Sequence, residues 1–416
     1  MLLTAYKNLL TLCLTSFLTA LIFSHNLIFF FISWVGINVS LYGSLLFSTN
    51  KTRIVTEAVS KYFIVGVLVT VTFLFSTLLY LVSYGTYSTE SLSFIVYKGL
   101  SNSELLTSPA LAPIEVFFYS ANISLFLFKL GAFPFHFYLP DIYNILDKKT
   151  NMLCYTVLVK LLIFLAMLSF LSQFWYISDF FSVIFLLSSI GSLAVSSISS
   201  IAEQNIRRFL SLSYLNSLGY ILLAVSSGLS YGFGALTFYS AELYLLSYLL
   251  AWLLVYFVIF NSASLYANSD MFIYFTDIVK LSSSNKKNFT TTLTKIALVV
   301  AVLSLLGLPP TVGFYAKSVL YLSVISSDIS TFTLMLVLVL APVMSMSYIR
   351  LVTVMLFPQP SKHASITLNR LELCVYERDL SILDAESSPL KLILYTAAML
   401  VLVLIVPIPY IISIII

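Results

Sequence analysis

FKLGAFPFHF, residues 128–137, places a lysine in an apolar run that glycine and proline interrupt almost at once. An ammonium group in hydrocarbon costs at least about 2.5 kcal/mol unless it is paired, hydrated or neutralised. A proline in a membrane helix frees a backbone carbonyl, which a neighbouring group has to satisfy. The two features together indicate a functional site within a membrane protein.

Composition agrees with this interpretation. Of the 416 residues, 60% are hydrophobic and only 9% are charged, and the mean hydropathy is +1.02. Soluble domains carry about 25% charged residues. Apolar stretches of about 20 residues, the length that crosses a bilayer, recur along the chain. They are continuous, whereas the strands of a membrane barrel alternate over about ten residues. The sequence therefore predicts an all-α polytopic membrane protein.

Metal and cofactor sites are not indicated. The three cysteines show no C-x-x-C spacing, the three histidines are scattered, and no phosphate-binding glycine loop occurs. These patterns exclude the usual zinc, iron–sulfur and nucleotide motifs. We expect the chain itself to bind no metal, no cofactor and no nucleic acid.

Hydropathy predicts about eleven transmembrane spans. They are expected at 8–24, 27–48, 60–83, 114–145, 150–172, 177–199, 207–227, 232–260, 294–326, 330–357 and 389–414. The fourth and ninth are expected to be broken, at Gly131 and Pro134 and at Gly307, Pro309 and Pro310. Because no small-residue cleavage site follows Lys7, the first apolar run is expected to be a span, not a signal peptide.

Basic residues lie almost entirely on one side of the membrane when the chain has eleven spans. Apart from the basic residues inside spans, the side of the N-terminus receives all of them except Lys98. Lys and Arg concentrate in cytoplasmic loops. We therefore expect the N-terminus to face the cytoplasm or mitochondrial matrix, and the C-terminus to face the opposite side.

Beyond the first three residues of each span, four basic residues remain, namely Lys129, Lys160, Lys317 and Arg350. A buried amine can take up and release a proton, so the three lysines are candidates for proton translocation. Arg350 lies close enough to an interface to reach it with a long side chain. For each lysine the structural alternative is the same extension toward the membrane surface.

Other candidate relay or partner residues are fewer. Glu57 precedes Lys61 by four positions, so the two share a helix face and form either an interfacial pair or part of a proton path. Glu242 lies inside the eighth span and needs a partner or water. His136 lies beside the first break and is either a relay or a hydrogen-bonded structural residue.

The two broken spans are five apart and cross the membrane in opposite directions. This pattern is typical of inverted repeats, in which broken helices line the ion path. We expect one membrane domain with five-helix repeats at 1–172 and 173–357. A polar connection at 358–388 and an additional C-terminal helix at 389–414 would follow. The residues alone predict a cation or proton transporter.

At the same residues the chain resembles a known family. KLGAFPFHFYLP at 129–140 is similar to the KLGxxPFHFWxP signature of antiporter-like subunits of respiratory complex I. WVG at 34–36, TEAVSKYF at 56–63, RRFLSLSY at 207–214 and GLPPTVGFYAK at 307–317 follow in the family's order. Over about residues 25–357 the chain most resembles the chain 2 family of mitochondrial NADH-ubiquinone oxidoreductase.

The resemblance implies a subunit that translocates protons through Lys129, Lys160 and Lys317, driven by quinone reduction elsewhere in the complex. NADH, FMN, iron–sulfur clusters and ubiquinone would be bound by other subunits. The partners would be other membrane-arm subunits and lipids such as cardiolipin. The location would be the mitochondrial inner membrane, with the N-terminus in the matrix and the C-terminus in the intermembrane space. Eleven spans would correspond to a shortened form that lacks three of fourteen helices.

Two positions depart from the family. Asn38 stands where the family has a membrane glutamate that would pair with Lys129, and Asn216 replaces a histidine. Either another carboxylate substitutes, or the channel runs differently, or the subunit does not pump. An Mrp-type cation/proton antiporter subunit and a transport-silent structural subunit therefore remain alternatives.

Overall fold

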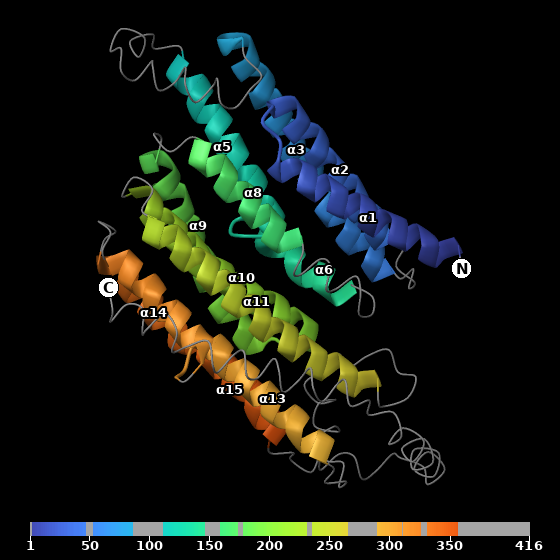
Figure 1. Ribbon diagram of the computed structural model, residues 1–416, viewed down its shortest axis with the longest axis vertical. Coiled ribbons are helices and arrows are strands. Elements are labelled where there is room, and N and C mark those ends of the chain that lie inside the picture. Colours follow the sequence, from blue (N-terminus) through green and yellow to red (C-terminus); the bar gives the residue numbers. More distant parts are fainter. Residues whose placement is uncertain are drawn as a thin grey trace. The chain divides into compact units, whose positions relative to one another are not determined.

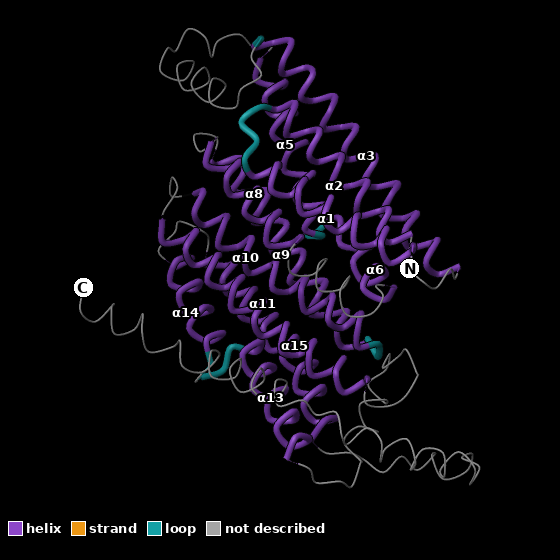
Figure 2. Tube along the Cα trace, turned by 45° about the vertical axis from the view of Figure 1, so that its right-hand side comes forward, coloured by secondary structure: helices purple, strands orange, loops and turns teal. Residues whose placement is uncertain are grey.

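The computed structural model of the chain describes residues 2–46, 53–85, 111–145, 159–173, 178–230, 235–264, 289–309, 311–325 and 331–356. Nearly all of these residues are helical, and none of them forms a strand (Figure 2). The helices are α1 (Leu2–Ile22), α2 (Leu27–Leu46), α3 (Arg53–Tyr84), α5 (Leu111–Leu130), η1 (Phe135–Tyr138), α6 (Leu139–Ile145), α8 (Val159–Gln173), α9 (Ser178–Ala202), α10 (Ile206–Ser230), α11 (Ala235–Ser264), α13 (Phe289–Leu306), α14 (Val312–Ile325) and α15 (Thr331–Leu356). The all-α fold class predicted from the sequence is confirmed.

Seven helical segments among the described residues are long and apolar enough to cross a membrane. They are Leu27–Leu46, Val55–Ser83, Val116–Ile145, Phe181–Ala202, Ile206–Leu229, Thr237–Tyr256 and Thr333–Thr353. Shorter apolar helices cover Leu9–Ile22, Val159–Ser172, Lys295–Leu306 and Val312–Ile325. The predicted segments 358–388 and 389–414 lie outside the described residues.

The third helix begins earlier than its apolar residues indicate. α3 starts at Arg53, whereas the apolar span was expected from residue 60. Helical hydrogen bonding does not require apolar side chains, so polar residues at a membrane surface can extend a span by two turns. As a result, Glu57 and Lys61 lie within the helix and not at its first residue.

The chain divides into two compact units. Unit 1 comprises Met1–Ser192 and Tyr214–Ala235, and unit 2 comprises Leu193–Ser213 and Leu236–Ile416. In unit 1, α1, α2 and α3 pack side by side, α5 packs on α3, and α8 packs on α5 (Figure 1). In unit 2, α13 packs against α14 and α15. The predicted five-helix repeats stay a prediction.

An aromatic cluster joins three helices of unit 1. The rings of Phe30 and Trp34 on α2 contact Phe126 on α5, and Phe30 and Phe126 contact Phe170 on α8, at centroid separations of 5.7 to 6.1 Å. Such separations are typical of favourable ring pairs. The cluster fixes α5, the helix that carries Lys129, against its neighbours.

Both predicted breaks are present, and they share one backbone motif. Gly131 ends α5 with φ +79°, and Gly307 ends α13 with φ +76°. At the first break, the N–H of Gly131 bonds to Phe128 O and that of Ala132 to Leu127 O. At the second break, Gly307 and Leu308 repeat this pattern toward Ser304 O and Leu303 O. This is the Schellman motif, which requires a left-handed residue after the helix.

The Schellman motif leaves two carbonyls of each helix without a backbone donor. These are the carbonyls of the last two helical residues, Lys129 and Leu130 in α5 and Leu305 and Leu306 in α13. In lipid no water is available to satisfy them, so a side chain has to do so. Each break therefore creates an acceptor site at the negative end of a helix.

Candidate functional site

Lys129 lies in the last turn of α5 and is only 2% exposed. Its Nζ donates hydrogen bonds to Asn38 Oδ1 on α2 and, at 2.9 Å, to Tyr62 OH on α3. The amine also lies 5.3 Å from the centroid of the Tyr62 ring, within cation–π range. Asn38 itself therefore takes the position of the expected carboxylate, together with a tyrosine that the sequence patterns did not single out.

Lys160, on α8, donates to the open carbonyls at the first break. Its Nζ donates to Lys129 O at 2.9 Å and to Leu130 O at 2.8 Å, the two carbonyls that the Schellman motif leaves open. A cation at the C-terminus of a helix also interacts favourably with the helix dipole. The ring centroid of Tyr214 lies 5.1 Å from the same amine. Lys160 thus contacts the backbone of the residue that carries the other buried amine.

Lys317, in unit 2, satisfies the second break in the same way. Its Nζ donates to Leu306 O at 2.8 Å and to Leu305 O at 3.3 Å. The lysine comes from α14, the second half of the same broken span. A Cβ placed on Gly307 would lie 2.6 Å from Lys317 Cδ, so this glycine also makes room for the lysine.

Lys160 and Lys317 therefore have equivalent roles, each at its own break. Both amines bind the last two carbonyls of a helix that ends at a left-handed glycine. Arg350 donates to Ile201 O and Glu203 O, at the end of α9, both at 3.0 Å. Through these bonds it satisfies carbonyls at a third helix end.

A small cavity lies beside the two amines of unit 1. Its volume is about 20 Å³, which is room for about one water molecule. Besides Lys129 and Lys160, its lining contains three tyrosines, Tyr62, Tyr138 and Tyr143, and otherwise aliphatic side chains. No carboxylate belongs to this lining. Two amines therefore line one small, mainly apolar cavity whose lining contains no carboxylate.

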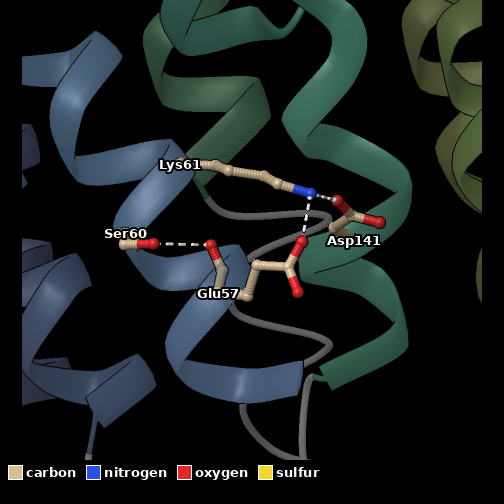
Figure 3. Close-up of polar contacts among 4 residues, drawn as sticks. All are labelled: Glu57, Ser60, Lys61 and Asp141. Carbon is tan, nitrogen blue, oxygen red and sulfur yellow. Dashed lines mark hydrogen bonds and ion pairs between the residues drawn. The ribbon is translucent and has the colours of Figure 1, made fainter. Parts of the chain in front are cut away.

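Lys61 joins α3 to α6 at the edge of unit 1. Its Nζ lies 2.9 Å from Glu57 Oε1 and 3.3 Å from Asp141 Oδ2 (Figure 3). The side chains of Lys61 and Glu57 are 45% and 62% exposed, so the pairing of these two residues is a surface feature. Asp141 was missed by the sequence analysis. It could have been found as the acidic residue within the second half of the fourth span.

The remaining predicted residues lie apart from this cavity. The His136 ring stacks on Phe133 at 5.8 Å, and its carbonyl accepts the N–H of Leu139. The Glu242 side chain is exposed on α11 and has no ion-pair partner among the described residues. Pro134 precedes η1 directly. Pro309 follows the end of α13, and Pro310 lies outside the described residues.

Metal-binding clusters are absent from the part of the chain that the structure describes. No group of three or more His, Cys, Asp or Glu side chains there could hold a metal ion. The expectation that the chain binds no cofactor stays a prediction. The chemistry that the described site offers is proton exchange on amines and hydroxyls.

Two curated proteins illustrate the sequence similarity. NADH-quinone oxidoreductase subunit N of Polaromonas naphthalenivorans (strain CJ2) is 28% identical over 327 residues, which cover 74% of this chain and 59% of that protein. The protein of the same name from Herminiimonas arsenicoxydans is 26% identical over 362 residues, which cover 82% of this chain and 66% of that protein. The chain thus spans about three fifths to two thirds of the length of these relatives.

Solved structures show the same fold. Respiratory complex I from Thermus thermophilus with bound aureothin contains a chain that matches with a TM-score of 0.63 and 22% identity, covering 95% of this chain and 78% of that one. The Mrp complex from Dietzia sp. DQ12-45-1b contains another matching chain, with a TM-score of 0.67 and 18% identity. The match covers 85% of this chain and 61% of that one.

The family assignment rests on most of the chain. Residues 24–345 match the family described as NADH:quinone oxidoreductase/Mrp antiporter, TM. This range contains both helix breaks, Lys129, Lys160 and Lys317, and Asn38. The chain belongs to the transmembrane family of NADH:quinone oxidoreductases and Mrp antiporters.

Proposed function

We propose that this chain is an antiporter-like subunit of a proton-translocating NADH:quinone oxidoreductase, respiratory complex I. The two relatives described above are both named as subunits of such an enzyme. The ordered motifs of the sequence point to the mitochondrial form. We further propose the mitochondrial inner membrane as its location, with the N-terminus in the matrix. Its partners would be other membrane subunits and lipids such as cardiolipin, and the redox cofactors would lie in those other subunits.

The hydrogen bonding of Lys129 and Lys160 carries this proposal. Each amine donates two hydrogen bonds to neutral acceptors. An ammonium group has three N–H donors, whereas a neutral amine keeps two N–H groups and a lone pair. The two hydrogen bonds can therefore persist in both forms. Only the third position changes, from N–H to lone pair, when a proton leaves.

Such a lysine can pass a proton with little rearrangement. Its neighbours need not move, because the two acceptors it holds serve both protonation states. Coulomb repulsion between two ammonium groups that face one small cavity favours protonating one of them at a time. Proton arrival at one amine would then promote release from the other. Lys317 likewise donates to two main-chain carbonyls in unit 2.

Lys160→Met tests the proposed transport. The substitution keeps an unbranched apolar side chain and removes the exchangeable proton. We expect fewer protons moved per NADH when the purified complex is reconstituted in proteoliposomes. Lys61→Met is the matched control, since it removes a lysine from the exposed pair with Glu57, and we expect it to leave the ratio unchanged. An assembled Lys160→Met complex with the wild-type ratio would contradict the proposal and favour a transport-silent subunit.

A second candidate function is a subunit of an Mrp-type cation/proton antiporter. It is favoured by the likeness of the fold to a chain of the Dietzia Mrp complex. The two candidates differ in their partners. Co-migration of the chain with a rotenone-sensitive NADH-oxidising activity on a native gel supports complex I. Migration with other antiporter subunits and without that activity supports the Mrp candidate.

A further inference from the structure

Glu242 differs from the other acidic residues of the apolar spans. Three acidic residues lie within the candidate membrane spans of the described chain, namely Glu57, Asp141 and Glu242. Glu57 and Asp141 both contact Lys61, at 2.9 and 3.3 Å (Figure 3). The carboxylate of Glu242 has no ion pair or side-chain hydrogen bond among the described residues. The chain thus supplies a cation for two of these carboxylates and none for the third.

The position of Glu242 on α11 places this carboxylate on an outward apolar face. It lies within the span Thr237–Tyr256, about 10 Å along α11 from the start of the helix at a rise of 1.5 Å per residue. Tyr239, Leu246 and Leu250 follow the same face at spacings of three and four residues. They are 51%, 50% and 39% exposed, and the Glu242 side chain between them is also exposed.

The cations within the spans of unit 2 are held by main-chain groups. Lys317 donates to the carbonyls at the second break, and Arg350 donates to carbonyls at the end of α9. Exposed leucines on a membrane helix are explained by lipid, but hydrocarbon offers no partner to a carboxylate. Ionisable residues inside membranes almost always pair or face a water-filled cavity. The lipid environment therefore accounts for Leu246 and Leu250 and does not account for Glu242.

We propose that the α11 face formed by Tyr239, Glu242, Leu246 and Leu250 is an interface with a second membrane protein. The partner presents a lysine or arginine to Glu242 from a transmembrane helix. Charge complementarity identifies it, because a carboxylate and a cation at the same depth each relieve the cost of the other in hydrocarbon. An arginine would bind the carboxylate through two hydrogen bonds, and Tyr239 would pack beside the pair as aromatic residues do at interface cores. The interface requires only that the chain assembles with another membrane protein, so it holds for both candidate functions described above.

A cryo-EM map of the purified complex tests the interface directly. We expect a lysine or arginine nitrogen of another chain within about 4 Å of the Glu242 carboxylate, the distance of an ion pair. Acyl chains alone, water alone or a residue of this same chain beside Glu242 would each overturn the proposal. This test needs no variant, so it does not depend on whether a substituted chain folds.

Glu242→Gln tests the contribution of the ion pair to assembly. We expect the complex that carries it to dissociate on native gels at a lower detergent concentration than the wild type. Glu57→Gln is the matched control, because it neutralises a carboxylate whose cation lies on the same chain, and we expect it to leave the dissociation point unchanged. Equal dissociation points for Glu242→Gln and the wild type would contradict the proposal.

An exchange of charges tests the identity of the partner. We expect Glu242→Lys to abolish co-migration, and replacement of the partner's cation by glutamate in the same complex to restore it. Failure of this exchange to restore co-migration would also contradict the proposal. Failure of the proposed function is recognised separately, since the chain would then migrate without NADH-oxidising activity whatever faces Glu242.

Discussion

Gly307→Ala is expected to destabilise the chain through two separable effects. The first is backbone strain, because an L-residue in the left-handed region costs about 1–2 kcal/mol, and Gly307 has φ +76°. The second is displacement of Lys317, whose Cδ would lie 2.6 Å and Nζ 3.2 Å from the new Cβ. Moving the amine breaks its bonds to Leu305 O and Leu306 O. A hydrogen bond to a charged group contributes about 1.5–3 kcal/mol. With both bonds lost, the expected total is about 4–8 kcal/mol.

Gly85→Ala separates the two effects. Gly85 ends α3 with a similar φ of +69°, but a Cβ there would meet no described atom within 4 Å. This substitution should therefore cost only the backbone strain, about 1–2 kcal/mol. Denaturant unfolding of the full chain in detergent micelles gives the free energy of unfolding for each variant. The excess cost of Gly307→Ala over Gly85→Ala measures the contribution of the lysine contact.

A double-mutant cycle makes the comparison decisive. In a Lys317→Met background no charged contact remains to be broken, and a flexible methionine can move away from the new Cβ. The cost of Gly307→Ala should then fall to that of Gly85→Ala. Equal costs for the two glycine substitutions in the wild-type background would refute the reasoning. An excess cost that persists in the methionine background would show that packing, not the lysine contact, is responsible.

Two further predictions concern Asn38, beside Lys129, and Asp141, beside Lys61. Asn38→Ala should lower the free energy of unfolding by about 1–3 kcal/mol, since it leaves a buried amine with one acceptor fewer. Asn38→Glu should still assemble, because it restores an acceptor beside Lys129. Complete loss of the assembled Asn38→Glu complex on a native gel would contradict this. Asp141→Asn should change the unfolding midpoint only slightly at low salt and not at all at high salt, because exposed ion pairs are screened. A large effect at high salt would show that the pair of Lys61 and Asp141 has a structural role beyond charge.

The sequence was sufficient to predict where the helices break and which lysines are buried. Glycine followed by proline in an apolar run has few other interpretations in a membrane protein, and Gly131 and Gly307 do end their helices at a left-handed residue. A lysine in a long apolar run likewise predicts that its side chain is buried. Lys129 and Lys160 are buried, and Lys317 is partly buried.

The tyrosine and main-chain partners of these lysines could not be predicted. Tyr62 and Tyr214 are two of 27 tyrosines, and nothing in their local sequence shows that their rings face an amine. The correspondence between Lys160 and Lys317 was hidden by their unequal distances from the breaks. One reaches its carbonyls from a following helix and the other from the second half of the same span. Only three-dimensional packing brings them to equivalent positions.

The use of main-chain acceptors has a consequence for divergence of this family. Every residue type presents the same carbonyl, so the acceptors at positions 130, 305 and 306 survive any substitution that preserves the helix and its terminal turn. The amine is thus held by main-chain groups, so the leucine side chains at these positions can be substituted without loss of the acceptors. The glycine that allows the terminal turn is the position that does not tolerate substitution. Lineages could therefore exchange most side chains near the break and still keep the contact intact.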